Sequence, residues 1–155
     1  DGRTSILDYC SNPTLVRWYN NGNCGIQKLN NKERKIRAFY KKVLRLCNGE
    51  KAISEGAFFD LMYVNYHNLN PNKQYLYLRH YENETLLIAV NFDSQDATVY
   101  ADIPQHAFDF LKIDSGTYFM KELISGKQKT VEFSSNAKFE LHIPAHNGVV
   151  WKIVK

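Results

Sequence analysis

The sequence predicts a mainly β fold: an antiparallel Greek-key β-sandwich of about eight strands, preceded by one amphipathic helix and an irregular N-terminal segment. Apolar residues recur with helical spacing over residues 36–47, and after Gly56 the period shortens from about 3.6 residues to about 2. Short strand-like segments then follow at a spacing of roughly ten residues, which is typical of a sandwich. The 10 Tyr and 9 Phe among the 155 residues suit a pleated surface, on which ring side chains pack well.

The N-terminal segment, residues 1–30, is predicted to be mostly loop, because turn-forming Asn, Gly and Pro residues cluster in it. Between two of these clusters, the segment from Pro13 to Tyr19 is predicted to form a short helix. Asn12 precedes this segment in the position of an N-cap. Pro13 falls in the first turn, where a helix needs no N–H from it.

The main helix is predicted to begin at Asn30 or Asn31 and to end at Gly49. Asn30 and Glu33 have the spacing of a capping box, in which each residue satisfies the backbone N–H of the other. Gly49 adopts the left-handed conformation at a helix end without strain. One helical face carries the apolar stripe, which consists of Ile36, Phe39, Tyr40, Val43, Leu44 and Cys47.

The rest of the chain is predicted to be strands, near residues 57–64, 74–81, 85–92, 96–103, 107–111, 116–123, 129–133, 138–143 and 148–154. A hairpin is expected at residues 82–84. The continuous apolar run from Leu86 to Val90 predicts a central strand that is covered on both faces. Turns are expected at residues 124–127 and at 146–148, where Asn147-Gly148 is a strong tight-turn signal.

Several segments carry a resemblance through their order along the chain. They are Asp1-Gly-Arg-Thr-Ser-Ile-Leu-Asp-Tyr9, Val16-Arg-Trp-Tyr-Asn20, the helix at 36–47, the strands at 75–79 and 86–92, and the final turn and strand at 143–153. This succession resembles the C-terminal part of an α-amylase-type enzyme of glycoside hydrolase family 13, where the last helix of a (β/α)8 barrel passes into a β-sandwich. The resemblance covers nearly the whole chain and rests on the order of the segments.

The resemblance implies two parts. Residues 1–50 would be the remnant of the barrel's end, a loop plus the last helix, and residues 51–155 would be the C-terminal β-sandwich domain. The chain would be a non-catalytic region that stabilises the catalytic barrel of an α-amylase-like enzyme of carbohydrate metabolism, one that acts on starch or other α-1,4-glucans. The three catalytic acids of that family lie on barrel strands that would precede Asp1. The chain alone is therefore predicted to be inactive.

The residues themselves predict no catalytic site, no metal site and no cofactor. A glycosidase needs two carboxyl groups that flank the scissile bond, whereas the acids of this chain fall mostly at strand ends and turns. His142 and His146 have a spacing that would place two ligands on one face of a helix, but Pro144 makes a helix there implausible. The thiols Cys10, Cys24 and Cys47 are expected to be free, with a bridge between the first two as the alternative.

Trp18 and Tyr19 are the candidate carbohydrate-binding residues. Aromatic rings present flat apolar faces to sugars, and the neighbouring Asn20 could bond to sugar hydroxyls. Packing of Trp18 against the absent barrel is the competing explanation. Trp151 alternates with apolar neighbours and is expected to pack in the core. A self-standing carbohydrate-binding β-sandwich module remains the alternative function.

The charge distribution bears on possible partners. The net charge is +4, but 7 of the 20 basic residues lie between Lys32 and Arg45, opposed there by Glu33 alone. A solvated helix face explains this pattern, so we expect no nucleic-acid partner. No apolar run approaches about 18 residues, and no membrane partner is expected. The expected partners are the missing catalytic barrel and an α-glucan. The apolar stripe further predicts that the helix folds onto the sandwich in a rearranged way, or that two copies pair as a homodimer through it.

Overall fold

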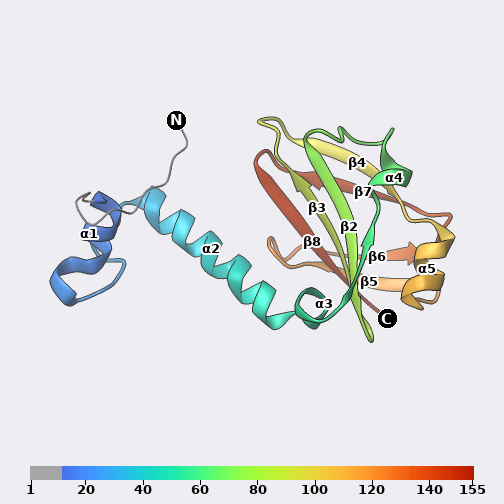
Figure 1. Cartoon of the computed structure of the whole chain (residues 1–155), viewed down its shortest axis with the longest axis horizontal. Coiled ribbons are helices and arrows are strands. Elements are labelled where there is room, and N and C mark those ends of the chain that lie inside the picture. Colours follow the sequence, from blue (N-terminus) through green and yellow to red (C-terminus); the bar gives the residue numbers. More distant parts are fainter. Residues whose placement is uncertain (1–11) are drawn as a thin grey trace. The chain divides into compact units, whose positions relative to one another are not determined.

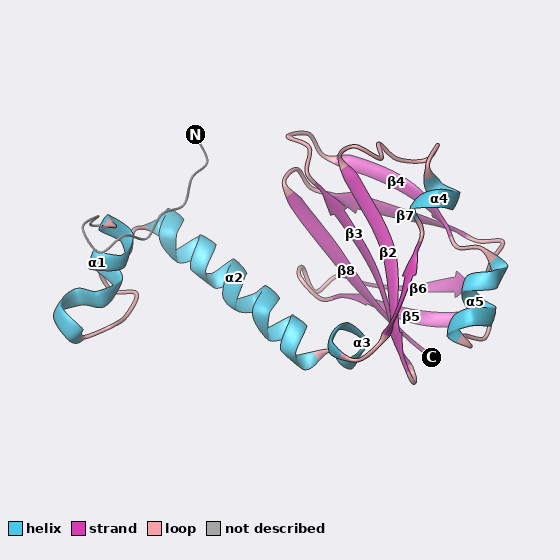
Figure 2. Cartoon of the chain, in the orientation of Figure 1, coloured by secondary structure: helices cyan, strands magenta, loops and turns pink. Residues whose placement is uncertain are grey.

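The computed structural model describes residues 12–155. They form two compact units, one ending at Arg45 and the other beginning at Leu46. The first of the resembling segments, residues 1–9, and the thiol of Cys10 lie outside the described residues. Figure 2 shows that the first unit is helical, while strands make up most of the second.

The first unit contains α1 (Pro13–Tyr19), the short 3-10 turn η1 (Asn20–Gly22) and most of α2 (Asn31–Gly49). The predicted N-cap of α1 is confirmed, because the Asn12 side chain accepts hydrogen bonds from the backbone N–H groups of Thr14 and Leu15, at 3.0 and 3.3 Å. Asn20 and Asn21 follow with φ of 48° and 54°. Asn tolerates this left-handed region better than most residues, so the chain turns sharply directly after α1.

The capping box at the start of α2 is also confirmed. The Asn30 side chain accepts a hydrogen bond from the Glu33 N–H, and the Glu33 carboxylate accepts one from the Asn30 N–H, each at 2.9 Å. Two donors that the helix cannot satisfy are thereby paired. Arg34 adds bonds to the carbonyl oxygens of Ile26 and Gln27, at 3.1 and 2.8 Å, which fix the loop before the helix.

The second unit, residues 46–155, is an antiparallel sandwich of eight strands (Figure 1). The strands are β1 (Ala57–Asp60), β2 (Gln74–Tyr81), β3 (Glu84–Asn91), β4 (Ala97–Asp102), β5 (Gly116–Glu122), β6 (Gln128–Phe133), β7 (Lys138–Ile143) and β8 (Asn147–Val154). The larger sheet has the order β1-β2-β3-β8-β5-β6 and the smaller one pairs β4 with β7. Pairs such as β3–β8 and β4–β7 join strands distant in sequence, as Greek-key connections do. The predicted fold class is confirmed.

Three short helices accompany the strands: α3 (Lys51–Ser54), α4 (Met62–Asn65) and α5 (Gln105–Leu111). Two of them correct the sequence prediction. Residues 107–111 were expected to form a strand but belong to α5, whose buried residues Ala107, Phe108 and Leu111 recur with helical spacing. The strand expected at 57–64 ends at Asp60, because the Asp60 carboxylate accepts a hydrogen bond from the Met62 N–H at 2.9 Å and starts α4.

A third correction concerns the last turn. Asn147 and Gly148 were expected to form it, yet both belong to β8, where they pair with Asn91 and Val90. The turn lies one step earlier and includes His146, whose φ is 49°. Glycine at position 148 is explained by packing instead of by a turn, since a Cβ there would lie 3.2 Å from the Ala89 carbonyl oxygen. By contrast, the central strand predicted at Leu86–Val90 is confirmed: it is β3, which lies between β2 and β8 in the larger sheet.

The core lies between the two sheets and under α5. Its buried side chains come from every strand of the sandwich except β1, and they centre on Phe133, which is fully buried among other rings. The ring centroids of Phe108, Phe139 and Tyr118 lie 5.1, 5.2 and 5.6 Å from that of Phe133. Trp151 is buried, as predicted. In the described part of the chain, no helix is both long and apolar enough to cross a membrane.

Candidate functional site

The two candidate carbohydrate-binding residues lie on α1. The Trp18 side chain is 37% exposed and that of Tyr19 is 57% exposed. The backbone around them is fixed, since the Trp18 carbonyl oxygen accepts a hydrogen bond from the Gly25 N–H at 2.9 Å. Both rings are accessible to a ligand, and sugar contact at this place stays a prediction.

The helices of the first unit are joined through one carboxylate. Glu33 of α2 accepts a hydrogen bond from the Thr14 hydroxyl at 2.7 Å and forms an ion pair with Arg17 of α1. The hydrogen bonds from Arg17, from Thr14 and from the Asn30 N–H, in that order of effect, lower the pKa of Glu33 to about 2. The segment that carries Trp18 and Tyr19 is thus attached to α2.

This attachment predicts a change on acidification. The pKa of Glu33 in the folded chain lies below its ordinary value of about 4.3. Its contribution to stability is therefore fully present above that ordinary value and is lost as the pH falls through about 2. We expect Arg17→Gln to raise the pKa of Glu33, because it removes the largest cause of the shift. A carbon-13 NMR titration of the Glu33 carboxyl group measures this.

Arg37→Gln is the matched control, since it removes the same charge from an exposed position of α2. The pKa of Glu33 is expected to stay near its wild-type value in this variant. An unchanged pKa of Glu33 in Arg17→Gln would mean that the ion pair does not hold α1 to α2 in solution.

Most of the apolar stripe of α2 is exposed. The side chains of Ile36, Phe39, Tyr40 and Leu44 are exposed, and no residue of α2 is buried. The stripe also includes Val43 and Cys47, which are half-buried. Covering of this stripe by the sandwich, by a barrel or by a second copy stays a prediction. Cys24 and Cys47 are free thiols.

A second apolar surface lies on the outer face of the larger sheet. Three rings from β1 and β2 form what we call the outer row: Phe58, Tyr77 and Tyr75. The centroids of Phe58 and Tyr77 are 5.4 Å apart, and those of Tyr77 and Tyr75 are 5.5 Å apart. Phe58 and Tyr75 are exposed. Elsewhere on this face, α3 covers the apolar residues, and its Ala52 is fully buried against Leu86, Ile88 and Val150.

Polar contacts hold α3 on that face. Arg79 of β2 donates to the carbonyl oxygens of Ala52 and Ile53, at 2.8 and 2.7 Å. Lys152 of β8 forms ion pairs with Glu50 and Glu84, at 2.6 and 3.2 Å. Partial burial lowers the pKa of Lys152, but the hydrogen bonds to the two carboxylates outweigh burial and leave the pKa raised.

Six aspartates at or near strand ends and turns form ion pairs or hydrogen bonds with nearby groups. Asp93 pairs with Lys73 at 2.8 Å, and Asp114 pairs with Lys155 at 3.2 Å. The other four bond to nearby groups: Asp60 to the Met62 N–H, Asp96 to the Ala145 N–H, Asp102 to Asn68, and Asp109 to Gln105. Among residues 12–155, no three His, Cys, Asp or Glu side chains converge as metal ligands would. His142 lies 3.6 Å from Asp96.

The structure reveals one ring cluster that the sequence analysis missed. We call it the edge cluster, and it consists of Phe59 (β1), Tyr63 (α4), His106 and Phe110 (α5). The Phe59 centroid lies 5.3 Å from that of His106 and 5.9 Å from that of Phe110. Tyr63 follows at 5.7 Å from His106, and its hydroxyl bonds to Nε2 of that ring. The sequence signal was the four-residue spacing of His106 and Phe110, which places them on one face of a helix.

Comparison with known proteins places this fold among α-amylases. No protein-family model and no curated protein sequence matches the chain. The solved structure of an Anoxybacillus α-amylase matches 76% of the chain with a TM-score of 0.53 at 20% identity. That of the Geobacillus thermoleovorans α-amylase in complex with acarbose matches 86% with a TM-score of 0.58 at 15% identity. AmyP in complex with maltose matches 83% with a TM-score of 0.60 at 14% identity.

The lengths of these proteins differ from that of the chain. The chain spans 22% of the Anoxybacillus structure, 23% of AmyP and 24% of the Geobacillus structure. At these identities the match is one of fold. The expected resemblance to α-amylases is confirmed at that level, and the match takes in only a part of each of those structures.

Proposed function

We propose that this chain is the non-catalytic C-terminal region of an α-amylase-like glycoside hydrolase that acts on α-1,4-glucans, and that it stabilises the catalytic barrel. One observation carries the proposal: the fold match takes in most of this chain but less than a quarter of each α-amylase structure. In this proposal residues 1–50 are the remnant of the barrel's end and residues 51–155 are the C-terminal domain.

The uncovered apolar surfaces support this proposal. Full burial of one large apolar side chain stabilises a protein by about 1.5–3 kcal/mol. Covering the four exposed side chains of the stripe, each already partly shielded, would contribute about 4 kcal/mol. A typical domain has a net stability of about 5–15 kcal/mol. A barrel that buried the stripe would thus gain a large part of its stability from this contact.

A homodimer is the other way to cover the stripe, since two copies can pair along it. The two arrangements require different native proteins: a longer polypeptide in the first, and two copies of an 18.0 kDa chain in the second. The mass of the native protein therefore decides between them.

The experiment is to detect the native protein in its source with an antibody raised against residues 51–155, under denaturing conditions. We expect a polypeptide several times heavier than 18.0 kDa, because the matched structures are between three and four times as long as this chain. A native polypeptide of 18.0 kDa would overturn the proposal.

A second test uses the longer enzyme. We expect Leu44→Asp to lower the unfolding temperature by several degrees, because a buried charge replaces an apolar contact with the barrel. Lys41→Asp on the same helix is the control and is expected to change it little, since Lys41 is exposed and lies off the stripe. Differential scanning calorimetry measures both variants. Equal melting temperatures would show that the stripe does not face the barrel.

A self-standing carbohydrate-binding module is the second candidate function. It requires exposed rings that can stack on sugars, and the edge cluster supplies two of them. Tyr63 is 55% exposed and Phe110 is 62% exposed. Contact with sugar is also compatible with the first proposal, since a C-terminal domain can hold a polysaccharide near a catalytic barrel.

A further inference from the structure

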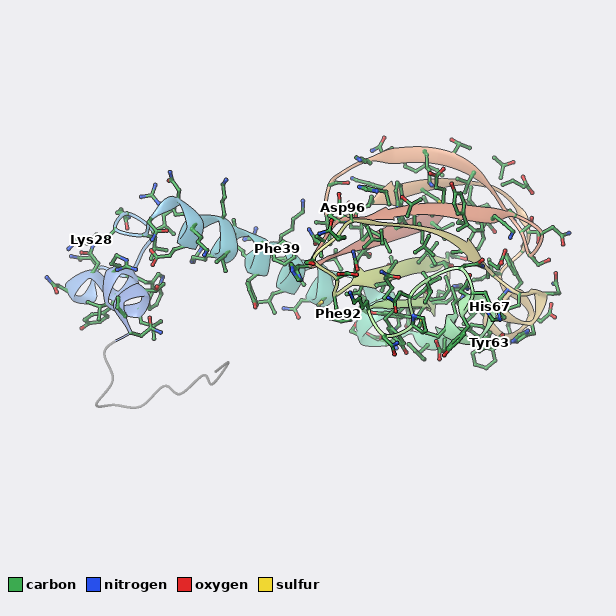
Figure 3. The ribbon with its side chains drawn as sticks, turned by 90° about the horizontal axis from the view of Figure 1, so that it is seen from above. Lys28, Phe39, Tyr63, His67, Phe92 and Asp96 are labelled. Carbon is green, nitrogen blue, oxygen red and sulfur yellow. The ribbon has the colours of Figure 1, made fainter. Side chains whose placement is uncertain are left out.

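The edge cluster is a continuous run of four rings, in the order Phe110, Phe59, His106 and Tyr63. Neighbouring centroids lie between 5.3 and 5.9 Å apart, with interplanar angles of 41–56°. Phe59 is half-buried and packs against the core, whereas the rings at both ends are exposed. Figure 3 shows the Tyr63 ring projecting from the surface of the sandwich. The cluster thus offers two accessible rings at the ends of a run whose ring Phe59 is half-buried against the core.

The elements that carry these rings are held firmly. Below the exposed rings of α5, its other face is buried through Phe108 and Leu111. Asn65 is fully buried and ties α4 to β4: its amide donates to the Asp102 carbonyl oxygen at 2.8 Å and accepts from the Asp102 N–H at 2.7 Å. A ligand would therefore find the rings already in place and would lose little free energy in ordering them.

Polar groups surround the rings. The Tyr63 hydroxyl bonds to His106, and Gln105 bonds to Asp109 at 3.0 Å beside Phe110. The Asp60 carboxylate lies close enough to act on Tyr63: burial, and then the negative charge of Asp60, raises the pKa of the Tyr63 hydroxyl. The exposed Tyr63 ring thus lies near an imidazole and a carboxylate.

This combination fits one class of ligand. The cluster is aromatic, without the aliphatic side chains that dominate contacts with lipid chains. Its flanking carboxylates Asp60 and Asp109 would repel phosphate or sulfate groups. A pyranose ring has an apolar face of C–H groups that suits an aromatic ring, and a rim of hydroxyls that bond to carboxylates and imidazoles.

We infer that the edge cluster is a surface site for a neutral pyranose oligosaccharide, which stacks on Tyr63 and Phe110 and bonds through its hydroxyls to Asp60 and His106. The choice of an α-1,4-glucan as the first ligand rests on the proposed function. The site is separate from Trp18 and Tyr19, which belong to the other unit.

The test is calorimetric titration of the 155-residue chain with maltoheptaose and, separately, with cellohexaose. We expect saturable binding of maltoheptaose. Tyr63→Ala and Phe110→Ala should each raise the Kd about tenfold, because each removes a stacking face. Tyr63→Phe should raise it less, since the ring remains. Tyr100→Ala on β4, a similarly exposed tyrosine outside the cluster, should leave the Kd unchanged.

The outcomes separate the two proposals. The chain could bind cellohexaose but not maltoheptaose, with the binding weakened by Tyr63→Ala. That result would support the site but would contradict an α-glucan as the ligand in the proposed function. No saturable binding of either sugar in the millimolar range, or binding that only Trp18→Ala weakens, would overturn the site. Should a variant fail to fold by circular dichroism, the backbone NMR shifts of the wild type decide. Shifts at residues 62–64 and 105–110 on titration support the site, and their absence overturns it.

Discussion

Asn65→Ala is expected to lower the free energy of unfolding of the sandwich by about 3 kcal/mol. Asn65 is fully buried at the end of α4, and its amide donates to the carbonyl oxygens of Leu61 and Asp102, at 2.9 and 2.8 Å. Its side-chain oxygen accepts the Asp102 N–H at 2.7 Å. Alanine removes these three hydrogen bonds and leaves the Asp102 N–H and carbonyl groups without their side-chain partner. Each unsatisfied buried group costs about 1–3 kcal/mol, and partial hydration offsets some of the sum.

Urea unfolding measures the free energy of unfolding of Asn65→Ala. The fluorescence of Trp151 monitors the transition in a Trp18→Phe background, so that the signal comes from the sandwich. Asn68→Ala is the matched control. Asn68 is half-buried and donates to the Asp102 carboxylate at 2.8 Å, so its loss is expected to cost about 1 kcal/mol or less. Because Asn65 positions α4, its replacement should also weaken binding of maltoheptaose at Tyr63. Equal stabilities of the two variants would show that Asn65 does not anchor α4.

Glu122→Ala is expected to cost a similar amount, about 3 kcal/mol. Glu122 ends β5 and is 2% exposed. One carboxylate oxygen accepts the N–H groups of Ile124 and Val150, at 3.0 and 2.9 Å, and the other accepts the N–H of Ser125. The side chain thereby organises the turn between β5 and β6 and links that turn to β8. Glu132→Ala on β6 is the control: Glu132 lies on the exposed side of its strand and accepts one bond, from Thr117 at 3.3 Å.

The ionised form of Glu122 makes these bonds, so their effect depends on pH. Burial raises the pKa of Glu122, but the hydrogen bonds from Ser125, Val150 and Ile124 together outweigh burial and hold the pKa below its ordinary value. The contribution is therefore fully present above the ordinary value of about 4.3 and is lost as the pH falls through the lowered pKa. The stabilities of the wild type and Glu122→Gln should converge on acidification. A difference that stays constant with pH would contradict this assignment.

The sequence predicted best those features whose signals are local. The capping box at the start of α2 needs only Asn30 and Glu33, and the N-cap of α1 needs only Asn12 and the first turn. The continuous apolar run from Leu86 to Val90 was also sufficient to predict a central strand. A strand that is buried on both faces has apolar residues on both, so polar residues do not alternate with apolar ones along it.

The errors arose where a short segment fits two periods. In α5, Phe108 and Phe110 are two residues apart and resemble a strand, while Phe108 and Leu111 are three apart and form the buried face of a helix. Seven residues are too few for the period to decide between them. At β1, Leu61 and Met62 continue the apolar run, so the strand appeared longer. The bond from the Met62 N–H to Asp60 ends it.

The edge cluster could not be predicted for a further reason. The bond between Tyr63 and His106 joins residues 43 positions apart in the chain, and it forms only because α4 and α5 meet at the same edge of the sandwich. Periodicity describes one element at a time and contains no information about which two elements meet. The exposed aromatic residues were visible in the sequence, but their assembly into one surface depends on the tertiary fold.

The place of β8 determines when this sandwich can form during protein synthesis. The ribosome makes β8 last of the eight strands, yet β8 joins β3 to β5 in the larger sheet. Until residues 147–154 have left the exit tunnel, β1-β2-β3 and β5-β6 are separate pieces with open edges. Translation that stops before Asn147 therefore yields a chain whose two unpaired edges expose it to aggregation and proteolysis. The sandwich can therefore fold only after the ribosome has made β8.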